Sequence, residues 1–431
     1  MQNAKGENPS ADVKVAKNPD FVTNLLVRGV APALFLTILS VGQNSKKGFF
    51  FMDVKFQGLE KRLTPQDAHY FYGYFDKFPW NSKGEHPVHK VDFAGKHPRF
   101  GDKAEIGILR NGSFDKVAET LSWCWQQGSM LEFFDDDTLI WNDIEDDHFV
   151  ARLSDGRTYS RPVYTLSADR SYALSLNFSR LDVERPGYGY PGGNDPSMLH
   201  AFPADDGVFL IDLKSGESRL IVSLKQLVDD FYAPGADSNV NWVNHLTFSP
   251  DGRKIAFLHR FRTYGPWGRG VKSYVTRMFT CNIDGSDLWK LPIDFHASHY
   301  TWKNNEELIV YSRLPNGGDQ YRIYKVGDLS PRIFARDRLP ANGHCSFSPD
   351  KKLLLTDSYT EADGCRELVV YNEEKDIRYS LGRYFSPDIL FCTRCDLHPR
   401  WSQDGKRISF DSFHEKFRGT YMIELPEEIL K

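Results

Sequence analysis

Histidines recur at one position of a repeated sequence pattern. In each copy a histidine opens a short apolar segment, an aromatic residue follows three positions later, and a polar tight turn comes next; the histidines are His245, His299, His344 and His398. His69 starts a longer, less regular copy. Histidine changes charge near neutral pH and binds metals, so a cluster of such residues is suited to proton transfer or metal binding. A repeat also duplicates residues that have a structural role, so a structural role remains the alternative for each histidine taken singly.

The repeat has the pattern of a β-hairpin. The clearest copy, residues 241–260, reads NWVNHLTFSPDGRKIAFLHR, in which Asp-Gly supplies the turn and apolar residues alternate in the flanking segments. Further copies occupy residues 298–312, 342–357 and 396–411, and weaker ones lie at 160–178, 128–142 and 69–93. Seven hairpins spaced by roughly 40–50 residues are typical of propeller blades, which stack to bury their faces. We therefore predict an all-β fold, a seven-bladed β-propeller.

The two ends of the chain set the limits of the ring. The last copy supplies three strands, the third over residues 420–425, so a fourth must come from elsewhere. We expect it within Phe49–Thr64, where it would close the ring and leave no long open edge. The predicted propeller covers residues 47–425. A short N-terminal helical or irregular extension precedes it (residues 1–46, with a helix over 19–42), and a tail follows at 426–431.

The composition limits which binding partners and which cellular compartment we expect. The 431 residues carry a net charge of −4, which argues against nucleic acid or an anionic membrane surface as a partner recognised through overall charge. The six cysteines follow no disulfide-scaffold spacing, which favours a reducing, cytoplasmic compartment. Residues 21–42 are apolar but interrupted by Asn24, Arg28 and Pro32, too short a clean run for stable membrane insertion. Export or membrane anchoring through residues 21–42 is the alternative, and the oligomeric state is left open.

The predicted topology brings arginines and aromatic residues to the histidines. In a propeller blade the start of the innermost strand and the link between its second and third strands lie on the same face of the ring. Arg161 and Arg400 then join the histidines at the mouth of the central channel. The surrounding links supply Arg262, Tyr264, Trp267 and Arg418. Guanidinium groups bind carboxylates and aromatic faces cover sugar rings, so we expect an anionic carbohydrate as ligand.

Two further motifs bear on the type of chemistry. Cys392 and Cys395 precede His398 with metal-like spacing, but a single Cys-x-x-Cys pair is a weak zinc signal. The sequence contains no Gly-x-Ser-x-Gly motif and no α/β half after the propeller, which argues against a serine hydrolase of the prolyl-peptidase type.

The blade hairpins resemble TolB-type propeller repeats, and residues 241–425 resemble oligogalacturonate lyase. The matching pieces, in order, are NHLTFSPDGRKIAFLHR, TRMFTCNIDGSDLWKL, SHYTW, GHCSFSPD and CDLHPRW, with KRLT and DAHYFYG upstream. That family cleaves uronic-acid oligosaccharides by β-elimination on a seven-bladed propeller. The resemblance places His245 at the family's catalytic base, and His299 and His398 at two ligands of its divalent metal, manganese or calcium. This chain has Cys395 where the family has a glutamine, and Arg400 where it has a histidine.

A uronate lyase needs a base for the C5 proton, a positive group beside the carboxylate and an acid for the leaving oxygen. We predict His245 as the base, Arg400 with His299 and His398 as the carboxylate clamp, and His344 or Tyr264 as the acid. The predicted substrate-binding residues are His69, Arg161, Arg262, Trp267 and Arg418. If a metal is bound, His299, His398 and Cys395 are its predicted ligands.

Two other functions remain open at this stage. One is a non-catalytic propeller that binds carbohydrate or protein at the same mouth. The other is a glycoside hydrolase, for which Asp357 and Asp411 could supply the two carboxylates that such enzymes require.

Overall fold

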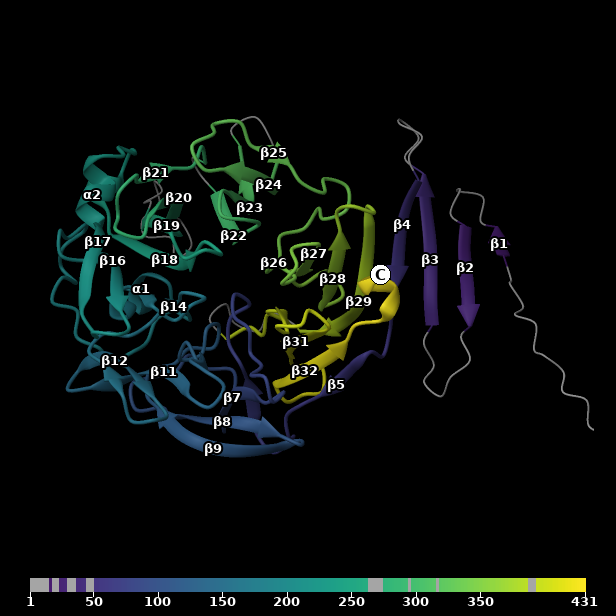
Figure 1. Cartoon of the computed structure of the whole chain (residues 1–431), viewed down its shortest axis with the longest axis horizontal. Helices are drawn as coiled ribbons and strands as arrows, with labels where there is room; N and C mark the ends of the chain where they lie inside the picture. The colour runs from purple at the N-terminus through teal and green to yellow at the C-terminus, as the bar shows by residue number, and fades with distance from the viewer. Residues whose placement is uncertain are drawn as a thin grey trace, which may run out of the picture.

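The computed structural model describes residues 15–17, 23–28, 36–43, 50–262, 274–293, 296–314, 318–386 and 393–431. The described strands form seven sheets arranged in a ring around a central channel (Figure 1). Each sheet is a blade, numbered here in chain order, and the first strand of each blade is the innermost. The predicted seven-bladed propeller is confirmed.

The blades are built from consecutive antiparallel strands. Blade one contains β6 (His69–Phe71), β7 (His86–Val91), β8 (Ala104–Arg110) and β9 (Ser113–Thr120). Blade two contains β10 (Glu132–Phe133), β11 (Leu139–Glu145), β12 (His148–Leu153) and β13 (Thr158–Tyr159). Blade three contains β14 (Thr165–Leu166), β15 (Tyr172–Ser175), β16 (Gly207–Asp212) and β17 (Ser218–Ser223). Blade four contains β18 (Asn241–Phe248), β19 (Lys254–Arg262), β20 (Tyr274–Asn282) and β21 (Trp289–Lys290).

The remaining blades follow the same plan. Blade five contains β22 (His296–Trp302), β23 (Glu307–Arg313), β24 (Gln320–Lys325) and β25 (Arg332–Ile333). Blade six contains β26 (Ser346–Phe347), β27 (Leu353–Asp357), β28 (Cys365–Asn372) and β29 (Ile377–Phe385). Blade seven contains β30 (Arg400–Trp401), β31 (Arg407–Ser412) and β32 (Gly419–Glu424). The described helices are short: α1 (Phe178–Glu184), α2 (Leu224–Asp229), α3 (Glu427–Leu430) and the 3-10 helix η1 (Ala236–Ser238).

A strand from the N-terminal side closes the ring. β5 (Glu60–Arg62) pairs antiparallel with β32 and becomes the outermost strand of blade seven, with Tyr421 opposite Arg62. It lies inside the predicted stretch Phe49–Thr64, so the predicted closure is confirmed. The earlier part of that stretch joins a different blade: β4 (Phe50–Lys55) pairs in parallel with β29 of blade six.

The predicted N-terminal helix is wrong for the residues that the structure describes. The chain forms β1 (Val15–Lys17), β2 (Thr23–Arg28) and β3 (Leu36–Gln43), which continue outward from β4 and give blade six eight strands (Figure 1). The physical reason is the free edge of β29. An apolar run that fits either a helix or a strand gains backbone hydrogen bonds when it adds to an existing sheet. No helix among the described residues is long and apolar enough to span a membrane.

Repeated turns explain why the hairpins recur in the sequence. In the turn of blade four the Ser249 hydroxyl donates to Asp251 at 2.7 Å and accepts from the Lys254 backbone N–H at 2.9 Å. Equivalent Ser-x-Asp contacts fix the turns of blades three, six and seven, at Ser167, Ser348 and Ser402. The Asp251 side chain also accepts from the Arg253 backbone N–H at 3.1 Å, two residues on, a contact that stabilises turns. Apolar side chains from facing blades pack between these hairpins into continuous buried clusters.

Candidate functional site

Two aromatic residues fill the channel where the histidines converge. After β6 the chain turns inward at Gly73, whose φ is +142° and where an added Cβ would lie 2.8 Å from the carbonyl oxygen of Gln127. This close approach requires glycine. Tyr74 then stacks on His245 with ring centroids 5.2 Å apart and meets His398 edge-on at 4.9 Å. Phe75 lies 5.3 Å from His344 and 5.9 Å from His299. We call Tyr74 and Phe75 the aromatic plug, and the four histidines around it the channel histidines.

Arg400 holds the aromatic plug in place. Its guanidinium donates to the carbonyl oxygens of Tyr74 at 3.0 Å and Gly73 at 2.5 Å, and pairs with Asp411 at 2.8 Å. Arg400 and Asp411 are both fully buried. The predicted role of Arg400 as a carboxylate clamp is therefore corrected: its donors are engaged within the protein, and it positions the plug.

Irregular backbone aims the channel histidines. The pairing of β18 with β19 shifts between Asn244 and Thr247, and His245 in this bulge has a φ of +53°. β22 carries a similar bulge around His299, and His398 has a φ of +43°. A bulge redirects a side chain, and left-handed backbone in a non-glycine residue is strained and concentrates at functional sites. The repeat thus places three histidines at bulged or strained positions facing one channel.

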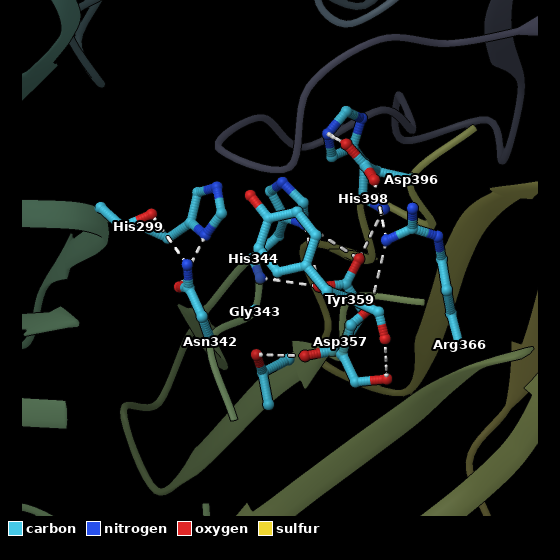
Figure 2. A network of polar contacts seen from close by, with 12 residues as sticks. His299, Asn342, Gly343, His344, Asp357, Tyr359, Arg366, Asp396 and His398 are labelled. Carbon is cyan, nitrogen blue, oxygen red and sulfur yellow. Dashed lines mark hydrogen bonds and ion pairs between the residues drawn. The ribbon is translucent and has the colours of Figure 1, made fainter. Parts of the chain in front are cut away.

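Asp357 organises His344 and His398 (Figure 2). One of its oxygens lies 2.8 Å from Nδ1 of His344 and accepts from the His344 backbone N–H at 2.7 Å, while the other accepts from the His398 backbone N–H at 3.2 Å. Nδ1 of His398 lies 3.0 Å from the carbonyl oxygen of Gly73. In both rings Nε2 is buried and has no hydrogen-bond partner among the described residues.

These two Nε2 atoms and the carboxylate of Asp396 form a group that fits a divalent metal. One ligand atom from each of His344, Asp396 and His398 lies within 4.8 Å of the other two. A ligating histidine usually bonds a carboxylate or a carbonyl through its other ring nitrogen, as both of these do. Arg366 and Arg394 also pair with Asp396, at 2.8 Å and 2.7 Å. Burial raises the pKa of Asp396, but the two arginines outweigh it and lower the pKa to about 2.

The predicted metal ligand Cys395 is not part of this group. Its Sγ lies 3.9 Å from the carbonyl oxygen of Asp396, and burial raises its pKa to about 11. A thiol that holds its proton is a poor metal ligand. His299 is also outside the group, with Nδ1 3.0 Å from the side-chain oxygen of Asn342 (Figure 2).

Burial keeps three of the channel histidines neutral. It lowers the pKa values of His245, His299 and His398 well below the ordinary value, and neighbouring charged groups lower them further. For His245 the next cause is the positive charge of Arg260, followed by that of Arg185. A neutral imidazole is the form that can accept a proton or bind a metal.

Arginines and tyrosines surround His245 on its other side. Tyr188 meets His245 edge-on at 5.6 Å, and its hydroxyl accepts from Arg394 at 3.0 Å. Arg185 lies over the rings of Tyr188 and Tyr274, at 4.9 Å and 5.3 Å. Burial raises the pKa of Tyr274, but Arg260 and Arg185 outweigh it and lower the value.

Arg260 stands out in this group by its burial and its lack of an ion-pair partner among the described residues. It is 4% exposed and lies over the Tyr274 ring at 5.1 Å, and its Nε donates to Thr276 at 3.1 Å. Its Nη1 has no hydrogen-bond partner and its charge has no ion-pair partner among the described residues. A buried, unpaired cation is costly unless a ligand supplies the anion.

Several predicted binding residues lie elsewhere. His69 is at the rim, where Nδ1 accepts from the Arg418 backbone N–H at 3.2 Å and the ring lies 5.4 Å from Phe417. Arg161 lies over Phe209 in blade three at 3.7 Å, with Nε 3.4 Å from Ser218 of β17, so the expectation that it reaches the channel mouth is wrong. Arg262 pairs with Glu184 at 2.7 Å. Tyr264 and Trp267 are outside the described residues.

The two carboxylates considered for a hydrolase are structural. Asp357 holds His344 and His398, while Asp411 pairs with Arg400 and accepts from the Thr420 hydroxyl at 2.8 Å. Both side chains are buried and engaged. Neither carboxylate is available as the acid or the base of a glycoside hydrolase.

Sequence reasoning missed the residues that complete the site. Asp396 had a signal, since it stands two residues before His398, inside a motif already noted for metal-like spacing. Arg185 and Tyr188 belong to a link that is rich in arginine and tyrosine, residues 180–191. The plug residues Tyr74 and Phe75 had no signal, because nothing in their spacing distinguishes a residue in the channel from one between blades.

Comparisons with known proteins bear on the fold. No family model matches this sequence, and no curated protein sequence matches it. A solved structure of oligogalacturonate lyase in complex with manganese superposes with a TM-score of 0.57 and 17% identity, over 92% of this chain and 98% of that one. This chain has the fold of oligogalacturonate lyase. The oligogalacturonate lyase of Vibrio parahaemolyticus superposes with a TM-score of 0.56 and 14% identity, over 91% of this chain and 98% of that one.

Proposed function

We propose that the protein is a lyase that cleaves uronic-acid-containing oligo- or polysaccharides by β-elimination at the channel histidines. The observation that carries the proposal is the buried guanidinium of Arg260, which has no ion-pair partner among the described residues and lies close to the neutral imidazole of His245. β-Elimination at a uronate needs a base beside a positive group that neutralises the carboxylate, because that neutralisation acidifies the neighbouring C–H. The fold of oligogalacturonate lyase supports the same assignment.

His245 is the proposed base. Its Nδ1 lies 3.3 Å from the Tyr164 hydroxyl, which fixes the ring. Nε2 can accept the C5 proton of the sugar in the tautomer that carries the ring proton on Nδ1. The lowered pKa of His245 keeps the ring neutral, so the base needs no prior deprotonation at neutral pH.

The surrounding residues supply the other two requirements. Arg260 and Arg185 would neutralise the carboxylate as negative charge builds on the sugar. Tyr274 would protonate the leaving oxygen, since the arginines that lower its pKa make it a stronger acid than an ordinary tyrosine. Tyr274 replaces His344 in this role, because the His344 ring is tied to Asp357.

A divalent metal would be held by His344, Asp396 and His398. When bound, it would act as a Lewis acid that polarises the uronate carboxylate. The oligogalacturonate lyase structure with 17% identity to this chain is a complex with manganese, which makes manganese the ion to test.

The test is product formation on a panel of uronic glycans: polygalacturonate, glucuronan, alginate and hyaluronan. Elimination leaves a double bond conjugated to the carboxylate, so turnover appears as ultraviolet absorbance that hydrolysis does not produce. His245→Ala should lower kcat by about 10²–10⁴-fold with substrate affinity nearly unchanged, as expected for loss of a general base. His148→Ala, at an exposed position of blade two, is the matched control and should keep its activity. Full activity of the His245 variant would refute the assignment.

The second candidate function is binding without turnover. The aromatic plug favours it, because Tyr74 and Phe75 cover the channel histidines on the side of blade one. Measurable affinity for a uronic glycan, with no unsaturated product from the same glycan, would support the binding module over the lyase.

A further inference from the structure

A cavity of about 230 Å³ lies beside the channel, between blade one and the segment that leads into β30. Its walls are mostly apolar, and they include Ala94, Trp125, Ser386, Arg394, Phe413 and Arg418. Ala94 is exposed, so the cavity opens to solvent near this residue. We call it the Arg418 cavity.

Arg418 brings an unpaired charge to this cavity. The side chain is 2% exposed. Its Nη2 donates to the carbonyl oxygen of Trp125 at 2.9 Å, and the guanidinium carbon lies 4.9 Å from the Phe71 ring and 5.1 Å from the Trp125 ring. Nε and Nη1 have no hydrogen-bond partner, and Arg418 forms no ion pair within the described ranges.

Ligand binding explains a buried arginine without an ion pair better than a contribution to folding stability does. Burying a cation without an anionic partner destabilises a fold, and an apolar side chain of similar size would avoid that cost. The cation–π contacts with Phe71 and Trp125 offset part of it. Nε and Nη1 still lack acceptors among the described residues, and an anion entering the cavity would supply them.

The lining of the cavity indicates which anion. The other arginine on the cavity wall, Arg394, pairs with Asp396 at 2.7 Å, so Arg418 is the wall arginine that has no ion pair within the described ranges. A single guanidinium in a mostly apolar cavity suits a carboxylate, which carries one charge, better than a dianionic phosphate. Trp125 and Phe413 offer aromatic faces of the kind that stack on sugar rings.

We propose that the Arg418 cavity is a second carboxylate-binding site, one that takes a single hexuronate unit. The choice of a hexuronate over other monocarboxylates rests on the proposed function, whereas the carboxylate site itself does not. The cavity wall includes Arg394 and Cys395, which precede Asp396 and His398 in the same segment, so a ligand here would lie next to the channel histidines.

The test is equilibrium binding of D-galacturonate and D-glucuronate, with D-glucose as the uncharged control, by isothermal titration calorimetry. These monomers have no glycosidic leaving group at C4, so binding is measured apart from turnover. Wild-type protein should bind the uronates and not glucose. Arg418→Met, which keeps the apolar stem and removes the charge, should weaken binding at least tenfold, and Ala94→Leu should weaken it by narrowing the opening.

Two controls keep the outcome decisive. Arg253→Met removes an exposed arginine outside the cavity and should leave the affinity unchanged. Lys214→Met removes another exposed cation outside the cavity and should also leave the affinity unchanged. If Arg418→Met fails to fold, Ala94→Leu still tests the site, since Ala94 is exposed. Unchanged affinity in the cavity variants, or equal binding of glucose, would overturn the proposal. Uronate binding that depends on Arg418, without lyase activity on any glycan, would refute the proposed function and leave this site standing.

Discussion

Replacing Arg400 with alanine should destabilise the whole propeller through the aromatic plug. The substitution leaves the Asp411 carboxylate buried without its cationic partner and removes the donors to the carbonyl oxygens of Gly73 and Tyr74. Breaking one side of a buried ion pair costs about 3–5 kcal/mol. Typical free energies of unfolding are about 5–15 kcal/mol, so the loss would be a large fraction of the total.

Equilibrium urea unfolding, followed by tryptophan fluorescence, measures this loss. Arg253→Ala removes an exposed arginine and should change the free energy of unfolding by no more than about 0.5 kcal/mol. Arg400→Met combined with Asp411→Asn should lose less than the sum of the two single variants, because the two residues interact directly. A loss below about 1 kcal/mol in Arg400→Ala, together with weaker uronate binding, would refute the structural role and restore Arg400 as a carboxylate clamp.

Two further predictions concern protons and metal. Burial lowers the pKa of His89 to about 4, whereas a histidine in the unfolded chain titrates near 6.5. As the pH drops from about 6.5 to 4, the unfolded state therefore takes up a proton that the folded state does not. His89 should lower the free energy of unfolding by about 1.4 kcal/mol per pH unit over this range. His89→Gln should flatten that dependence in urea unfolding between pH 7.5 and 5, and an equal slope would contradict the assignment. Manganese at about 100 times its Kd should stabilise the wild type by about 2.7 kcal/mol, seen as a raised Tm. His344→Ala and His398→Ala should lose that rise while His299→Ala keeps it; no rise in wild type would exclude the site.

The fold was predictable because each blade repeats the same local physics. Two alternating strands recur from blade three to blade seven, with a Ser-x-Asp turn in blades three, four, six and seven and an aromatic residue before the turn in blades four to seven. Each feature acts within a few residues of chain. The N-terminal strands could not be predicted in the same way. Residues 36–43 belong to an apolar run that fits either a helix or a strand, and their place next to β4 depends on the edge that blade six offers.

The site was predictable only where the repeat is regular. In blade one the aromatic residue before the turn is Trp80, so the position three residues earlier is Lys77, which pairs with Glu132 at 3.0 Å. The sequence pattern instead points to His69, because the residues inserted between β6 and Trp80 lengthen this copy. The spacing from His398 predicts that Arg400 faces a ligand, but the plug carbonyls that Arg400 contacts come from a distant segment that spacing cannot reveal.

Closure of blade seven by β5 affects the order in which the chain can fold during synthesis. Arg62 and Tyr421 are 359 residues apart, and their contact forms only after nearly the whole chain has left the ribosome. Bringing together two points that far apart costs about 5 kcal/mol of chain entropy, by the logarithmic dependence on loop length. Until then β5 has no partner and the growing ring keeps an open side. The nascent propeller is therefore an open arc of blades with an unpaired strand at each end, and it becomes most exposed to misassociation just before its last strand arrives.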